Sequence, residues 1–183
     1  SNSVVHHDLT TPPAVDPHQG HATPSTRGAG GADDRGGVWS ATMSNEVIDR
    51  VTALVNGFDA RVQAAGADSW GNAAPCEGWT ARDVVVHVAN NIQRLGAGLQ
   101  GQQAGEIGPD EDIVAAWNTA KDTFFAGIST GDLSTPLPGP FGPMPAEQLI
   151  GRLVSTDVLV HTWDLARATG GDETLPEDAV AGA

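Results

Sequence analysis

Cysteine is nearly absent from the chain. Cys76 is the only one among 183 residues, so no internal disulfide can form. The N-terminus also lacks the basic region followed by an apolar region that marks a secretory signal. Because a chain without disulfides fits a reducing compartment, we expect a cytoplasmic protein.

Basic residues and long apolar runs are also scarce. Nine lysines and arginines stand against 23 aspartates and glutamates, which gives a net charge of −14. A charge this negative repels nucleic acids and anionic lipids, so we expect neither as a partner. No apolar run approaches the roughly 18 residues that a membrane span needs, and the length suggests one domain.

The motifs of several common activities are missing. The sequence contains no glycine-rich phosphate loop, no Gly-x-Ser-x-Gly motif and no internal repeat. No alternating pattern predicts a strand, since Val84-Val85-Val86 favours a strand locally but lies within a helical pattern. The sequence therefore predicts helices.

Residues 1–42 differ in composition from the rest. They are rich in proline, glycine, threonine, histidine and aspartate and show no hydrophobic period, so we expect a disordered tail. Met43 directly precedes the first periodic segment, and we interpret it as the natural start, with the tail as a non-native extension.

At the other end, Leu175-Pro176-Glu177-Asp178 opens a further helix within which the chain stops. We expect the domain, residues 43–183, to be truncated there.

Apolar residues at three- and four-residue steps predict four amphipathic helices. Thr80 is a good N-cap for the second helix, and the Gly170-Gly171 pair is a stop signal for the fourth. The expected fold is an all-α four-helix bundle, in which metal sites are built from inward side chains on facing helices. The expected helices cover residues 44–65, 80–99 and 145–169, with a third that follows the plausible cap Pro109-Asp110 and runs to Ile128; a long loop covers 129–144.

Two histidines lie outside the tail, and both have suggestive positions. His161 follows Asp157 by four residues, which on a helix places the imidazole and the carboxylate on one face. Val158 and Leu165 are apolar neighbours of that face, so we expect the pair to point into the bundle. His87 lies on the second turn of the helix that begins at Thr80.

These residues allow two interpretations. In the first, His87, Asp157 and His161 form a three-ligand metal site; such a set suits zinc with water in an open position, and also iron, nickel or manganese. In the second, Asp157 and His161 form a buried ion pair and His87 only packs in the core. Asp164 lies on the same face and could orient a ligand histidine. Cys76 precedes a helix N-terminus, where the helix dipole lowers a thiol pKa.

Two stretches resemble a known family. Residues 75–87 (Pro-Cys-Glu-Gly-Trp-Thr-Ala-Arg-Asp-Val-Val-Val-His) and 157–166 (Asp-Val-Leu-Val-His-Thr-Trp-Asp-Leu-Ala) resemble elements of the N-terminal domain of mycothiol-dependent maleylpyruvate isomerase, within the DinB-like metal-binding superfamily. The resemblance implies a DinB-like four-helix bundle and a divalent ion, usually zinc, with a water ligand. It also implies use of a low-molecular-weight thiol, which is mycothiol in actinobacteria. The family's metal ligands fall on His87, Asp157 and His161, where Asp157 replaces the isomerase's glutamate.

Three functional hypotheses follow. The first is a metal-dependent thiol transferase or isomerase, in which metal coordination favours the thiolate of a small-molecule thiol and this thiolate attacks an electrophilic substrate. The second is a metal-binding module without catalysis. The third is a metal-free structural bundle. The sequence assigns neither a catalytic residue nor an oligomeric state.

Overall fold

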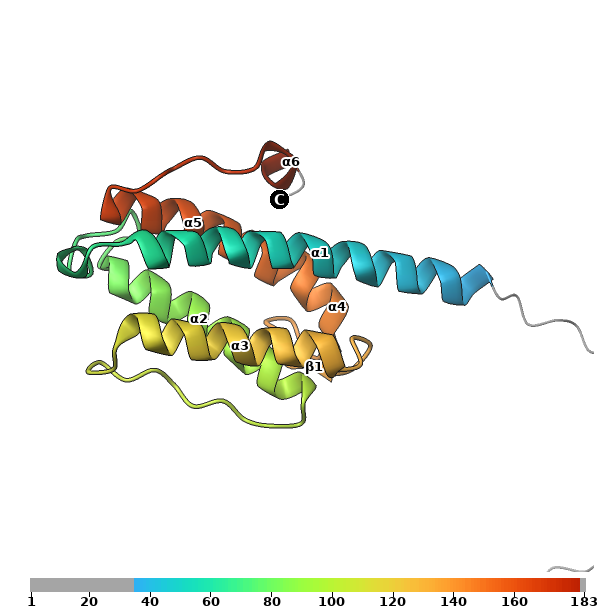
Figure 1. The fold of residues 1–183 in the computed structure, drawn as a ribbon. Helices are drawn as coiled ribbons and strands as arrows, with labels where there is room; N and C mark the ends of the chain where they lie inside the picture. Colours follow the sequence, from blue (N-terminus) through green and yellow to red (C-terminus); the bar gives the residue numbers. More distant parts are fainter. Residues whose placement is uncertain (1–34, 182–183) are drawn as a thin grey trace, which may run out of the picture. The chain divides into compact units, whose positions relative to one another are not determined.

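The protein folds as an all-α bundle, as the sequence predicted. The structure is a computed structural model that describes the backbone of residues 35–181 and the side chains of residues 45–181. Helix α2 packs along α3, and α1 packs along α5, which also contacts α2 (Figure 1). The elements are α1 (Arg35–Ala64), η1 (Ala67–Ser69), α2 (Ala81–Leu99), α3 (Ile113–Thr130), β1 (Pro136–Leu137), β2 (Met144–Pro145), α4 (Ala146–Leu149), η2 (Ile150–Val154), α5 (Ser155–Thr169) and α6 (Glu177–Ala181).

Helix α1 begins earlier than the sequence predicted. Its backbone is helical from Arg35, whereas the composition placed the helix start at Ser44. Extending an existing helix fixes one residue per hydrogen bond gained, so a helix can continue into a segment that would not start one. Of the predicted tail, residues 1–34 lie outside the described residues, and the disorder expected there stays a prediction.

The ends of the next helices show how local sequence sets them. Thr80 caps α2 as predicted, in a complete capping box: its side chain accepts from the backbone N–H of Asp83, and the Asp83 carboxylate accepts from the backbone N–H of Thr80. Helix α3 starts at Ile113 because Asp112, not Asp110, is its N-cap and accepts from Ala115 N at 2.8 Å.

The segment predicted as a long loop, 129–144, contains strand β1 and the first residue of strand β2, which form a short β-hairpin. Strand β1 pairs antiparallel with β2, with Pro136 opposite Pro145 and Leu137 opposite Met144. Strands of two residues each are too short for an alternating pattern to appear in the sequence, which explains why none was predicted. The predicted short helix at the C-terminal end is present as α6.

The predicted fourth helix, 145–169, begins one residue later, at Ala146, because Pro145 is its N-cap and belongs to β2. The helix is continuous from α4 through η2 to α5, and η2 is a π-helical turn. The side chain of Arg50 on α1 donates to the Gly151 carbonyl at 2.6 Å, and Ser155 Oγ donates to the Ile150 carbonyl at 2.9 Å. The Ile150 carbonyl thus accepts both the backbone N–H and the hydroxyl of Ser155, and Arg50 gives the Gly151 carbonyl a partner from another helix. The helix ends as predicted at Gly170, whose φ of 69° is a left-handed conformation that glycine adopts readily.

Helices α2 and α3 approach each other closely at a pair of glycines. A Cβ built on Gly127 would lie 2.4 Å from the Gly96 carbonyl oxygen, and one built on Gly96 would lie 2.4 Å from the Thr123 carbonyl oxygen. The absence of side chains at Gly96 and Gly127 lets the two helix backbones meet.

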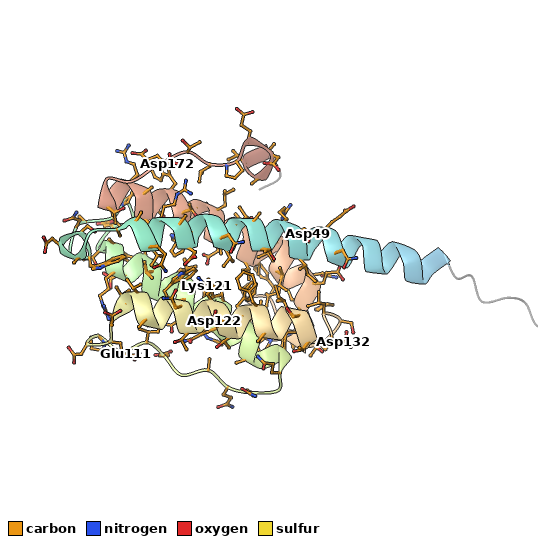
Figure 2. All side chains as sticks on the ribbon, viewed as in Figure 1. Asp49, Glu111, Lys121, Asp122, Asp132 and Asp172 are labelled. Atoms are coloured by element: carbon orange, nitrogen blue, oxygen red, sulfur yellow. The ribbon has the colours of Figure 1, made fainter. Side chains whose placement is uncertain are left out.

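A polar network joins α1 to α3. Asp59 accepts from the indole Nε1–H of the fully buried Trp117 at 2.8 Å and pairs with the Lys121 ammonium at 2.9 Å. Lys121 lies between the two helices (Figure 2). Burial alone raises the pKa of Asp59, but hydrogen bonds from Lys121, Trp117 and Gln63 outweigh it and lower the pKa.

We expect Asp59→Ala to lower the free energy of unfolding by about 1–3 kcal/mol, because the buried indole N–H of Trp117 loses its acceptor. Asp59→Asn keeps an oxygen that can accept from this N–H and should cost less, since it removes mainly the partly exposed pair with Lys121. Urea unfolding of both variants checks the order. Equal losses would mean that the charge pair, not the indole bond, carries the stabilisation.

Among the described residues, no helix combines the length with the apolar character that crossing a membrane requires.

Candidate metal centre

The structure brings the three predicted ligand residues together. His87 comes from the second turn of α2, while Asp157 and His161 come from adjacent turns of α5, which packs against α2. Asp157 Oδ1 lies 3.1 Å from His87 Nε2 and 3.4 Å from His161 Nε2. One ligand atom from each residue lies within 4.8 Å of the others.

The spacing of these atoms fits a metal ion. A tetrahedral zinc ion with ligands at about 2.0–2.1 Å holds neighbouring ligand atoms about 3.3 Å apart. The two distances from Asp157 Oδ1 are close to that value. Side-chain exposure is 34% for His87, 29% for Asp157 and 13% for His161, so the His87 and Asp157 side of the cluster opens to solvent. A bound ion could therefore keep an exchangeable ligand there.

The electrostatics of the cluster favour a charged carboxylate. Burial alone raises the pKa of Asp157, but hydrogen bonds with His161, His87 and Asn91 outweigh it and hold the pKa well below its ordinary value. Burial alone lowers the pKa of His161, yet contacts with Asp157 and Asp164 outweigh it and raise the pKa. An ionised carboxylate beside two imidazoles is a donor set that a divalent cation accepts.

Asp164 lies behind His161, on the side away from Asp157. Its Oδ2 lies 2.8 Å from His161 Nδ1, and its side chain is only 6% exposed. Because an ionised carboxylate only accepts, Nδ1 carries the hydrogen, which leaves Nε2 as the nitrogen that could ligate an ion when the ring is neutral. This is the orienting contact that the sequence suggested for Asp164.

A second cluster of ligand-type residues shares His161. Cys76 Sγ donates to Asp164 Oδ2 at 3.3 Å, and His161 Nδ1 donates to the same oxygen. Burial, together with the bond and charge of Asp164, raises the pKa of the Cys76 thiol, so the effect of the helix dipole does not prevail. Protons on sulfur and on Nδ1 satisfy this cluster without an ion. The first cluster is therefore the better candidate.

An aromatic ring covers the two imidazoles. Trp79 stacks on His161 with ring centroids 5.7 Å apart and planes 19° apart, and it meets His87 at 5.1 Å and 54°. The two imidazoles themselves meet edge to face at 4.9 Å. Trp79 thus limits the rotation of both rings and shields one side of the cluster from water.

Sequence reasoning missed Asn91. This residue lies one turn after His87 on α2, and its Nδ2 is 3.2 Å from Asp157 Oδ2 and 3.1 Å from His87 Nε2. The spacing of four from His87 was the available signal, because it places both residues on one helix face. His87 therefore has polar partners, whereas the second interpretation supposed that it only packs in the core.

Known proteins resemble this chain in sequence. No solved structure matches the chain. Two uncharacterised proteins of Mycobacterium tuberculosis, one from strain CDC 1551 / Oshkosh and one from strain H37Rv, are each 34% identical to it over 124 residues, which are 67% of this chain and 68% of each relative. Residues 51–166 match the family described as the mycothiol maleylpyruvate isomerase N-terminal domain. The matched segment contains α2 and most of α5, with His87, Asp157 and His161, and by this match the chain belongs to that family.

Proposed function

We propose that the protein binds a divalent metal ion, with zinc expected, through His87 Nε2, Asp157 Oδ1 and His161 Nε2. The observation that carries this proposal is the convergence of the three atoms, with Oδ1 at 3.1 and 3.4 Å from the two nitrogens. A simple ion pair needs one imidazole. Two imidazoles on one carboxylate oxygen are the arrangement expected of a ligand set.

We further propose that this site serves a small-molecule thiol of the mycothiol type and an electrophilic substrate, as a transferase or isomerase. A divalent ion held there would supply Lewis acidity and favour the thiolate over the thiol. The support is the family match and the exposure of the cluster on its His87 and Asp157 side. Asp164 keeps the Nδ1 hydrogen of His161 in place, and Trp79 excludes water from the covered side.

A metal-binding module without catalysis is the second candidate. It requires only the three converging ligand atoms and no thiol or substrate beside them. A thiol-conjugation assay distinguishes the two candidates, using an electrophilic acceptor with and without the thiol and the ion. The enzyme proposal predicts conjugation above the uncatalysed rate only when both are present. Binding of the ion with no rate above background would favour the module.

Thermal melts at about pH 5 and about pH 7.5, with and without a chelator, test metal binding. Imidazole ligands must be neutral and have an unperturbed pKa of about 6.5, so protons displace the ion as pH falls. We expect the chelator to lower the melting temperature clearly at about pH 7.5 and much less at about pH 5. Melts indifferent to chelator at both values would contradict the metal site.

The metal-free protein should show the opposite trend. Because the pKa of His161 is raised, its pairing with Asp157 stabilises fully below about pH 6.5 and is lost as pH rises through the raised pKa. The lowered pKa of Asp157 means that its own contribution is lost only as pH falls well below about 4. Between about pH 5 and 7.5, the stability that the site contributes should therefore fall with rising pH in the metal-free protein and rise with pH in the metal-bound protein.

A further inference from the structure

We propose that Asn91 is the positioning residue that holds Asp157 as a one-oxygen metal ligand. The proposal rests on the metal site proposed above and assigns a role to a residue outside it. Asn91 lies on α2, four residues after His87, and faces α5 across the interface that carries the candidate site.

The two oxygens of Asp157 have different neighbours. Oδ1 faces both imidazole nitrogens, His87 Nε2 at 3.1 Å and His161 Nε2 at 3.4 Å. Oδ2 lies 3.2 Å from Asn91 Nδ2. A carboxylate accepts only, so the amide must present its NH₂ group, and this donor occupies Oδ2. The bond leaves Oδ1 alone to face the point where an ion would lie.

Without this bond, the carboxylate would be free to turn. The terminal torsion of aspartate is broad, so the side chain could present either oxygen, or both, to a cation. Fixing one rotation beforehand lowers the entropy that binding must remove. Partners of metal-ligating carboxylates commonly act in this way, and their loss weakens metal binding about 10–100-fold.

Asn91 Nδ2 also lies 3.1 Å from His87 Nε2, so the amide spans both ligand residues. Nε2 cannot donate to the Asp157 carboxylate and accept from the amide at once, so without an ion it takes one of these two partners. An ion bound by the Nε2 lone pair would displace the amide from this nitrogen and leave its hydrogen bond to Asp157 Oδ2.

The neighbouring residue Asn90 provides a matched control. Its Oδ1 accepts from the backbone N–H of Ile107 at 3.1 Å and from Gln93 Nε2 at 3.0 Å, so it fastens a loop to α2. Asn90→Ala and Asn91→Ala remove the same side chain from adjacent positions of one helix. Both replacements raise helix propensity, so we expect both variants to fold.

The experiment measures the zinc affinity of the wild type, Asn91→Ala and Asn90→Ala by competition with a chromophoric chelator at about pH 7.5. It also records the visible spectra of the cobalt-loaded proteins and the melting temperatures of the metal-free ones. We expect Asn91→Ala to bind zinc about 10-fold or more weakly and to change the cobalt spectrum, because the coordination of Asp157 changes. Asn90→Ala should match the wild type in both.

Each other outcome overturns the proposal. If the wild type binds zinc and Asn91→Ala has the same affinity and cobalt spectrum, the role of Asn91 is rejected and the metal site is retained. Equal weakening in Asn90→Ala would show a general effect of disturbing α2. A wild type that binds no zinc would reject the metal site itself, and this role with it.

Discussion

Replacing Gly127 by alanine is expected to destabilise the bundle strongly, although it adds only one methyl group. The added Cβ would lie 2.4 Å from the Gly96 carbonyl oxygen and 2.6 Å from the Gly96 Cα. Both atoms belong to backbone, so no side chain can rotate away and α2 must separate from α3. Overpacking typically costs about 1–3 kcal/mol, and a clash with backbone places this substitution at the upper end. For a domain of this size, the melting temperature should fall by about 6–12 °C.

Gly57→Ala provides the control. Gly57 also lies within a helix, α1, but a Cβ there meets only the end of the Arg61 side chain, at 3.9 Å. Alanine should therefore stabilise by about 0.5–1 kcal/mol through helix propensity alone. Calorimetry of both variants measures the contrast. A Gly127→Ala protein that melts with the wild type would contradict the close approach of α2 and α3.

Replacing His161 by alanine is expected to weaken zinc binding by more than about 100-fold, because the loss of a ligand exceeds the loss of a ligand's partner. His87→Ala should act alike, although its ring comes from a different helix. The physical reason is that two remaining protein ligands leave the ion largely to water. Equilibrium dialysis with zinc measures the affinities.

Two controls make the histidine result specific. The first is a background in which the tail histidines His6, His7, His18 and His21, which lie outside the described residues, are replaced by alanine, since any histidine can contribute to zinc binding. The second is Asp122→Asn, which removes an exposed carboxylate of α3 far along the sequence from the candidate ligands (Figure 2). Both should bind zinc as the wild type does. Unchanged affinity in His161→Ala within the first background would rule out the three-ligand site.

Much of the fold follows from local signals. The capping box at Thr80 and the left-handed Gly170 bound their helices as predicted, because caps act within a few residues. The extension of α1 to Arg35 and the π turn η2 did not follow from the sequence. The extension depends on the helix already formed by the residues that follow it in the chain. The π turn has a partner far away in the sequence, Arg50, which is 101 residues from Gly151.

The candidate site was predictable to a similar degree. The spacing of Asp157 and His161 and the scarcity of other histidines identified a set that the structure brings together. Asn91 and the bond from Cys76 to Asp164 were not identified as parts of one polar cluster. Asparagine and cysteine occur on many helix faces and loops, so only the packing of α2 against α5 reveals their partners.

The most direct test is the anomalous diffraction of crystals grown with one equivalent of zinc. We predict one strong peak about 2.0–2.2 Å from His87 Nε2, His161 Nε2 and Asp157 Oδ1. A peak bonded instead to Cys76 Sγ and Asp164 would move the site to the second cluster. No zinc peak near either cluster, in crystals that diffract well, would contradict the account and leave His87, Asp157 and His161 as a polar contact between α2 and α5.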